Sequence, residues 1–172
     1  MRILISGVPG VGKTLISKKV AETLNFTYIN IGDFAKENFE FPVEEDEIII
    51  DEEAVENKLL GLDNVIIDSH IPFKADKAII LRCNPKILLE RLNLRGYSKR
   101  KIQDNLMSEI LDYEIYAAKE IFSDEDIYEV LSEDVNETMI EVMNVINGQG
   151  ISLKNGNHFN FLTEDNLQMI EK

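Results

Sequence analysis

Cysteine and long apolar runs are scarce in this sequence, and each scarcity excludes a class of protein. Cys83 is the only cysteine, so the chain can form neither an internal disulfide nor a zinc site built from cysteines alone. No apolar run reaches the ~18 residues of a membrane-spanning helix, so we expect none. Residues 1–7 enter a short apolar run without the pattern of a cleavable signal peptide, which predicts a cytoplasmic protein.

Positive charge is also scarce. The 172 residues carry 18 Lys and Arg against 32 Asp and Glu, a formal net charge of −14, which argues against general nucleic-acid binding. Residues 37–56 hold ten acidic and no basic side chains, and residues 104–141 hold thirteen acidic side chains and one basic. Residues 74–101 reverse the sign, with nine basic and two acidic. We interpret the acidic stretches as solvated faces or a docking surface for a basic protein, and 74–101 as the segment that meets a polyanion.

Strand and helix patterns alternate along the first 147 residues. The apolar runs predict strands at 2–6, 26–31, 65–67, 78–82 and 127–131. The periodic segments predict helices at 13–24, 33–38 (with Asp33 as N-cap), 51–60, 84–95, 98–122 and 135–147. This alternation predicts an α/β fold with a five-stranded parallel sheet covered by helices on both faces.

The end of the chain has a different pattern. Residues 151–161 alternate around Asn155-Gly156, which predicts a β-hairpin, and residues 163–170 have room for one or two helical turns. We therefore interpret 148–172 as an appendage to a core that spans 1–147.

A glycine-rich loop follows the first predicted strand and opens the first predicted helix. Its sequence, Gly7-Val8-Pro9-Gly10-Val11-Gly12-Lys13-Thr14, matches the pattern G-x-x-x-x-G-K-[ST]. Glycines let backbone amides approach phosphates, and the helix N-terminus attracts the anion. Lys13 reaches the β- and γ-phosphates, and Thr14 offers a hydroxyl to Mg²⁺. The loop therefore predicts a site for ATP and Mg²⁺.

Asp68 ends the third predicted strand, where a carboxylate lies beside the phosphate loop and can hold Mg²⁺ through water. The alternative is an ordinary aspartate in a turn. His70 follows two residues later, where it could orient a water or an acceptor phosphate; the alternative is an ordinary structural or surface histidine.

The basic segment at 95–101 joins two predicted helices and has Gly96 as a possible hinge. Arg95, Lys99, Arg100 and Lys101 bring four positive charges, so the segment can close over ATP as a lid; the alternative is a basic connection that suits a helix C-terminus. Arg82 and Arg91 are further candidate cations. A GTPase is disfavoured, because the Asn-Lys at 57–58 lacks the aspartate of N-K-x-D.

These motifs, taken in order, resemble a known family. The phosphate loop, the stretch 28–33, Asp68-Ser69-His70 and Arg95-Gly96-Tyr97 look like the broad-specificity adenylate kinase and ATPase of the nucleus and of archaea. That family also assists maturation of the small ribosomal subunit. The resemblance covers about 1–147 and implies a P-loop NTPase fold of the nucleoside monophosphate kinase type. It implies an acceptor region at about 33–53 and a short lid at about 94–104.

The resemblance also assigns roles to single residues. It implies ATP contacts from a set of loop and lid residues, namely Gly10, Val11, Gly12, Lys13, Thr14, Leu15 and Arg95. Leu15 stands where the family often has threonine, so only the backbone amide of Leu15 can contact ATP. Asp33 and Lys36 fall in the acceptor region, and Lys36 replaces a frequent arginine with a point charge. Asp68 and His70 match the family's D-x-H.

Three functions remain open at this point. The first is transfer of the γ-phosphoryl group of ATP to AMP or another nucleoside monophosphate, with Mg²⁺ and some ATP hydrolysis. The second is an ATP-switched assembly factor that binds a basic small-subunit ribosomal protein, with incidental kinase activity. The third is a kinase that acts on a small hydroxylated acid. We favour the first, in which positioning and charge neutralisation supply most of the catalysis, without a covalent intermediate.

Overall fold

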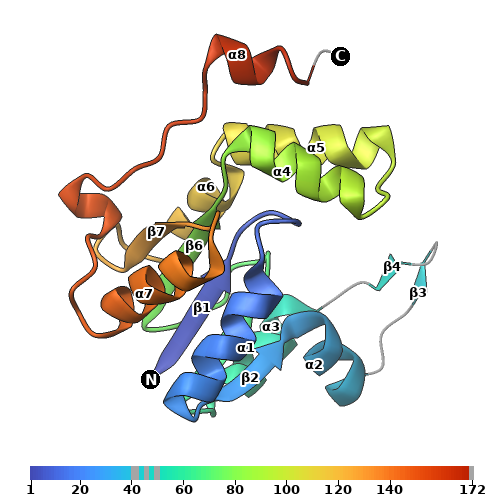
Figure 1. The fold of residues 1–172 in the computed structure, drawn as a ribbon. Helices are drawn as coiled ribbons and strands as arrows, with labels where there is room; N and C mark the ends of the chain where they lie inside the picture. The colour runs from blue at the N-terminus through green and yellow to red at the C-terminus, as the bar shows by residue number, and fades with distance from the viewer. Residues whose placement is uncertain (40–42, 45–46, 49–50, 171–172) are drawn as a thin grey trace.

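Five parallel strands form the centre of the fold, in the order β2-β5-β1-β6-β7 (Figure 1). They are β1 (Arg2–Ser6), β2 (Thr27–Asn30), β5 (Val65–Asp68), β6 (Lys77–Arg82) and β7 (Ile127–Leu131). The computed structural model describes residues 1–39, 43–44, 47–48 and 51–170. The short strands β3 (Val43–Glu44) and β4 (Glu47–Ile48) pair antiparallel away from the main sheet. The parallel five-stranded sheet predicted from the sequence is confirmed.

Helices cover both faces of this sheet (Figure 1). One buried cluster includes residues of α1 (Lys13–Leu24), α4 (Pro85–Leu94), α5 (Lys99–Ile110) and α7 (Val135–Ile146). The other includes residues of α2 (Ile31–Asn38), α3 (Glu52–Leu60) and α6 (Tyr113–Lys119). Among the described residues, no helix is long and apolar enough to cross a membrane.

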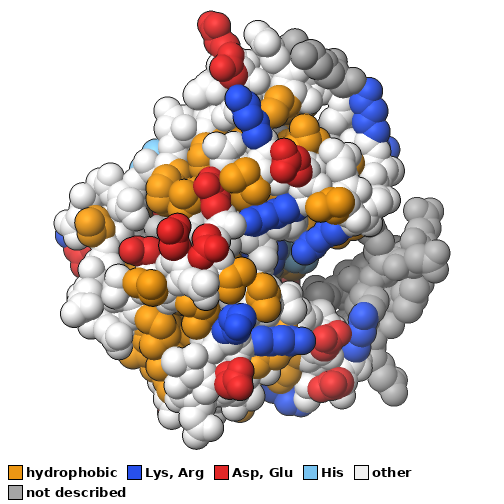
Figure 2. All heavy atoms as spheres, viewed as in Figure 1, with side chains coloured by type: hydrophobic (Ala, Val, Ile, Leu, Met, Phe, Trp, Pro, Cys, Tyr) orange, Lys and Arg blue, Asp and Glu red, His pale blue; other side chains and the backbone are white. Residues whose placement is uncertain are grey.

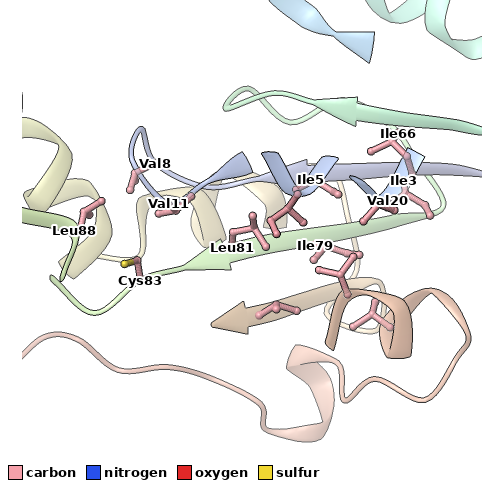
Figure 3. Close-up of a cluster of buried hydrophobic side chains, with 14 of the residues drawn as sticks. Ile3, Ile5, Val8, Val11, Val20, Ile66, Ile79, Leu81, Cys83 and Leu88 are labelled. Atoms are coloured by element: carbon pink, nitrogen blue, oxygen red, sulfur yellow. The ribbon is translucent and has the colours of Figure 1, made fainter. Parts of the chain in front are cut away.

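The central strand β1 is buried on both faces, which explains its unbroken apolar run. Ile3 and Ile5 belong to the cluster drawn in Figure 3, whereas Leu4 between them belongs to the cluster on the opposite face. All three side chains have 0% exposure. The strand therefore holds the phosphate loop, which begins at its end, on a rigid base.

Two helix starts show how local sequence sets the ends of these elements. Asn84 accepts a hydrogen bond from the Lys86 amide, and Pro85 takes the first helical position of α4, as predicted. At α2 the prediction of Asp33 as N-cap is wrong. Asn30 caps this helix instead, because its side chain accepts a hydrogen bond from the Asp33 amide at 3.2 Å.

The helix predicted over 98–122 is broken. Asp112 separates α5 from α6 and adopts a left-handed backbone, with φ of 57°. Its carboxylate accepts a hydrogen bond from the Arg82 guanidinium at 2.6 Å. Because aspartate tolerates this conformation better than most residues, a contact with a distant strand can redirect the chain here.

The predicted C-terminal hairpin is also wrong, since residues 151–170 contain no strand. Leu153–Asn155 form a 3-10 turn that ends at Gly156, whose φ is +88°. The following residues bind β7 through Glu129, with the Phe159 amide donating to its carboxylate at 3.2 Å. The chain then continues to the predicted last helical turn, α8 (Glu164–Leu167), and the Gln103 side chain on α5 donates to the Ile170 carbonyl at 2.8 Å (Figure 1).

Candidate nucleotide-binding site

The glycine-rich loop has a backbone that side chains would disrupt. Gly7, Gly10 and Gly12 have φ values of 138°, 102° and 103°. A Cβ atom at Gly7 would lie 2.5 Å from the Leu81 carbonyl oxygen, and one at Gly10 would lie 2.8 Å from a methyl group of Leu88. Gly7 and Gly10 are therefore required both by their positive φ values and by the lack of room for a Cβ atom. Without side chains at these positions, the loop packs closely against the sheet and α4 and leaves its backbone amides available to a phosphate.

Lys13 opens α1 and bends back over the loop. Its ammonium donates hydrogen bonds to the carbonyls of Gly7 and Val8, the latter at 3.1 Å. Burial lowers the pKa of Lys13, while the negative charges of Glu114 and Asp68 oppose that shift. The ammonium therefore lies against the loop carbonyls. Contact with phosphates bound there is the role that the motif predicts for it.

Asp68 lies at the point where three strands bring their carboxyl ends together. It is 2% exposed, and a single carboxylate oxygen, Oδ2, accepts three hydrogen bonds. The donors are the Thr14 hydroxyl at 2.8 Å, the Tyr28 hydroxyl at 2.8 Å and the Asn30 amide at 3.2 Å. Burial, together with Asp68, raises the pKa of Tyr28 to about 12, so this hydroxyl keeps its proton. Thr14 and Asp68, which the sequence predicts to hold Mg²⁺ together, are thus in direct contact.

Two residues of this group escaped the sequence reasoning as site residues. Tyr28 and Asn30 are separated by one position in β2, so their side chains point to the same face of the strand. This spacing was the signal that could have identified them. Each contributes a donor to Asp68, which β5 places beside β2 in the register Asn30 to Asp68.

Glu114 is a third residue that the sequence did not reveal. It lies on α6 with 8% exposure and accepts a hydrogen bond from the Ser6 hydroxyl at 3.0 Å. Burial raises the pKa of Glu114, while Ser6 and Lys13 oppose that shift. The contact joins residues 108 positions apart, so no local sequence pattern predicts it.

A cleft of about 740 Å³ opens above the phosphate loop and contains most of the predicted ATP-contacting residues. Its walls come from the loop and α1, from the lid side and from the segment after β7; they include Gly10, Val11, Gly12, Lys13, Thr14, Leu15, Arg91, Arg95 and residues 132–135. In Figure 2, Lys and Arg side chains gather around a hollow on one face of the molecule. The structure thus brings the predicted ATP residues together, including the exposed lid residue Arg95.

Arg91 holds one wall of this cleft in place. Its guanidinium donates to the carbonyl oxygens of Ser132 and Glu133, each at 2.8 Å. The Ser132 hydroxyl in turn donates to the Val11 carbonyl at 2.7 Å. The segment after β7 is therefore tied both to α4 and to the phosphate loop.

The predicted acceptor region is only partly described. Two cavities of about 230 Å³ each flank Asn30: one reaches Lys13, Thr14, Asp68 and His70, and the other reaches Tyr28, Asp33, Phe34 and Glu37. His70 is exposed at the surface of the protein. The protein nevertheless removes part of the water around its ring, and this partial burial, together with the positive charge of Lys13, lowers the pKa of His70, whereas Asp68 opposes the shift. Lys36 is exposed and lines neither of these two cavities. Residues 40–42, 45–46 and 49–50 of the predicted region lie outside the described residues.

Arg82 is absent from this site, which corrects its prediction as a catalytic cation. It is 1% exposed and forms ion pairs with Glu109 at 3.0 Å, Asp112 at 2.6 Å and Glu129 at 2.6 Å. All of its charge is directed into the protein, where it joins β6 to α5, to the α5–α6 turn and to β7. The role of Arg82 is therefore structural.

The chain matches known proteins across the region that contains this site. A family model described as an AAA domain matches residues 3–112. A relative from Thermococcus kodakarensis, named "Putative adenylate kinase", is 38% identical over 154 residues, 85% of each chain. A relative of the same name from Pyrococcus furiosus is 40% identical over 155 residues, 86% of this chain and 84% of that protein. The chain belongs to the family that this AAA domain model describes and is a relative of these archaeal proteins.

Solved structures of lower sequence identity share the fold of this chain. Shikimate kinase from Bacteroides thetaiotaomicron has a TM-score of 0.61 at 19% identity, covering 86% of this chain and 98% of that one. Deoxyadenosine kinase from M. mycoides with bound dATP has a TM-score of 0.58 at 17% identity, covering 86% and 100%. These likenesses confirm the predicted P-loop α/β fold, which the family shares with these kinases.

Proposed function

We propose that this protein is an adenylate kinase that transfers the γ-phosphoryl group of ATP to AMP and forms two ADP. The observation that carries the proposal is the position of Asp68. This carboxylate contacts Thr14 of the phosphate loop, and the two residues line one cavity together with His70 and Asn30. A donor and an acceptor phosphate could therefore meet beside Lys13. The names of the archaeal relatives support the same activity.

The residues present suit ATP with Mg²⁺. The Thr14 hydroxyl donates to Asp68 and keeps lone pairs for a cation, and a carboxylate with a hydroxyl is the oxygen donor set that Mg²⁺ prefers. When bound, Mg²⁺ would supply charge neutralisation at the β- and γ-phosphates. The loop amides would hold the same phosphates, and Lys13 would turn from the loop carbonyls towards them.

Transfer needs positioning rather than a covalent intermediate. An oxygen of the AMP phosphate forms a bond to the γ-phosphorus while the bond from that phosphorus to the β–γ bridging oxygen breaks, leaving ADP on both sides. Arg95, exposed at the cleft edge, would swing in from the lid and offset the charge. Asp33 would contact the acceptor, and Lys36 would have to move towards it. His70 would orient the acceptor phosphate or, without an acceptor, a water, which gives slow ATP hydrolysis.

A second candidate function is suggested by the surface of α5 and α6. Tyr113 and Tyr116 are 63% and 65% exposed on α6, and the carboxylates of Asp104 on α5 and Glu120 after α6 are exposed as well. Exposed aromatic rings and carboxylates of this kind suit a basic protein partner. An ATP-switched assembly factor for a basic small-subunit ribosomal protein, as the resemblance implies, would use such a surface. Co-purification of a basic protein at low salt and its release at high salt would favour this function.

The proposal is tested by measuring ADP formation from ATP with and without AMP. We expect AMP to accelerate ADP formation, and K13A to lose several orders of magnitude in rate because a charge that stabilises the transferring phosphoryl group is gone. Circular dichroism should show that K13A still folds. A screen of acceptors, including other nucleoside monophosphates and small hydroxylated acids, would identify the preferred class. Unchanged ADP formation on addition of AMP would leave ATP hydrolysis as the better description.

A further inference from the structure

Asn30 uses both ends of its side chain, and each end contacts a different part of the site. Its Nδ2 donates to Asp68 Oδ2 at 3.2 Å, and its Oδ1 accepts from the Asp33 amide at 3.2 Å. This orientation of the amide is fixed by its partners, because an ionised carboxylate only accepts and a backbone N–H only donates. Asn30 therefore ties the carboxylate beside the phosphate loop to the first turn of α2.

Two cavities lie beside Asn30. One is lined by Asp68 and Thr14 together with the first turn of α2 at 31–32, and the other by Asp33 and Phe34 of α2. Asn30 lines both. A molecule that moves the start of α2 as it binds will therefore pull on the side chain that orients Asp68.

The position of Asp68 depends on few groups. Oδ2 accepts from Thr14, Tyr28 and Asn30, and the first of these belongs to the phosphate loop itself. The Tyr28 hydroxyl comes from inside β2, a strand that the sheet holds in place. Asn30 is at the end of that strand and is the donor that also caps α2. Movement of α2 would thus reach Asp68 through Asn30.

We propose that Asn30 is a positioning residue that couples acceptor binding in the α2 cavity to the binding of ATP with Mg²⁺ at the phosphate loop. The inference rests on the proposed function, since it takes the acceptor to be a nucleoside monophosphate. Coupling of this kind is reciprocal: AMP tightens the binding of ATP by the same factor by which ATP tightens the binding of AMP. Typical factors are about 5 to 150.

Two variants separate this role from general support of Asp68. N30S loses the donor to Asp68 but keeps an oxygen that caps α2, because serine is a good N-cap. Y28F also removes one donor from the same oxygen of Asp68, yet Tyr28 has no hydrogen bond to α2 in the described part of the chain. Both variants should weaken ATP binding to a similar degree. Only N30S should remove the coupling.

Calorimetric titration measures the coupling without turnover. A non-hydrolysable ATP analogue is titrated with Mg²⁺ into the wild type, N30S and Y28F, each with and without AMP. We expect at least about a fivefold tightening by AMP in the wild type and in Y28F, and a factor near one in N30S. If N30S does not fold, N30T, which offers a similar capping oxygen, replaces it.

The outcomes distinguish this inference from the proposed function. If AMP binds but its effect on the analogue survives in N30S, or is lost equally in Y28F, the coupling through Asn30 is wrong while the kinase proposal stands. The same holds if the wild type binds both ligands independently. If AMP does not bind the wild type at all, both the proposed function and the inference are overturned.

Discussion

Replacement of Arg82 by methionine should destabilise the fold severely, because three carboxylates share this one guanidinium. Arg82 pairs with Glu109, Asp112 and Glu129 at 2.6–3.0 Å, and the side chains of Glu109 and Glu129 are 1% and 0% exposed. Methionine has a similar length and fills much of the space, so the change removes mainly the charge. The carboxylates would then lie in the interior without a cation.

The structure sets the size of this effect. Removal of one partner from a buried ion pair costs about 3–5 kcal/mol, because the remaining charge stays desolvated. A domain of this size has a free energy of unfolding of about 5–15 kcal/mol, and each kcal/mol shifts its melting temperature by about 2–4 °C. R82M should therefore melt roughly 6–20 °C below the wild type, or fail to accumulate as folded protein.

The stability that R82M loses relative to the wild type should depend on pH in a definite direction. Burial raises the pKa of Glu109 above its ordinary value of 4.5, and Arg82 opposes that shift, so its loss raises the pKa further. A carboxyl group with a raised pKa in the folded state costs stability above its ordinary pKa. The deficit of R82M should therefore be largest at neutral pH and shrink as the pH falls towards 4.5, where Glu109 takes up a proton.

Thermal unfolding followed by circular dichroism at pH 5.5 and 7.5 measures both effects. The matched control is R100M, because Arg100 is 93% exposed and its nearest oxygen on Asp104 is 3.9 Å away. That surface pair should contribute less than about 1 kcal/mol. The reasoning is refuted if R82M and R100M have the same melting temperature. It is also refuted if the difference in melting temperature between R82M and the wild type is larger at pH 5.5 than at pH 7.5.

Three further changes test other contacts. G10A should lose about 1–3 kcal/mol, measured by urea unfolding, and should weaken ATP binding, because its φ is +102° and its Cβ would meet Leu88. E114Q should raise the melting temperature at pH 8 more than at pH 5: burial raises the pKa of Glu114 above 4.5, so its ionised form costs stability only at higher pH, and glutamine still accepts the Ser6 hydrogen bond. H158A should lose about 1–3 kcal/mol in urea unfolding, because His158 contacts the buried Glu129 carboxylate at 2.6 Å; an unchanged midpoint would mean that this contact does not stabilise the fold.

The parts of the fold that local sequence determines were predictable. The phosphate loop needs glycine at each sharp bend, and Asn84-Pro85 supplies both a cap and a favoured first helical residue. Asp68 could be placed near Thr14 because the carboxyl ends of neighbouring parallel strands meet at one edge of the sheet. In each case the position of the residue follows from the geometry of a single loop, helix start or pair of neighbouring strands.

The parts that failed depend on contacts between distant residues. The break at Asp112 depends on a hydrogen bond from Arg82, 30 residues away, and helical periodicity contains no trace of it. At Asn155-Gly156 the turn was predicted well, since Gly156 has a positive φ. The flanking segments do not pair, because polar groups after the turn bind Glu129 instead, including the Asn157 side chain at 3.1 Å to its carbonyl.

The acidic stretch at 104–141 was interpreted as a solvated face, and the structure corrects this interpretation in part. Glu109, Glu114 and Glu129 are 2–8% exposed, because they face Arg82 and Ser6 from the interior. Negative charge therefore lies beneath the phosphate loop as well as outside the protein. Within the described site Glu114 and Asp68 oppose Lys13, so the polyphosphate of ATP gains little net attraction from these groups alone. In the proposed function, Arg95 and Mg²⁺ would supply the further positive charge that strong binding of the polyphosphate needs.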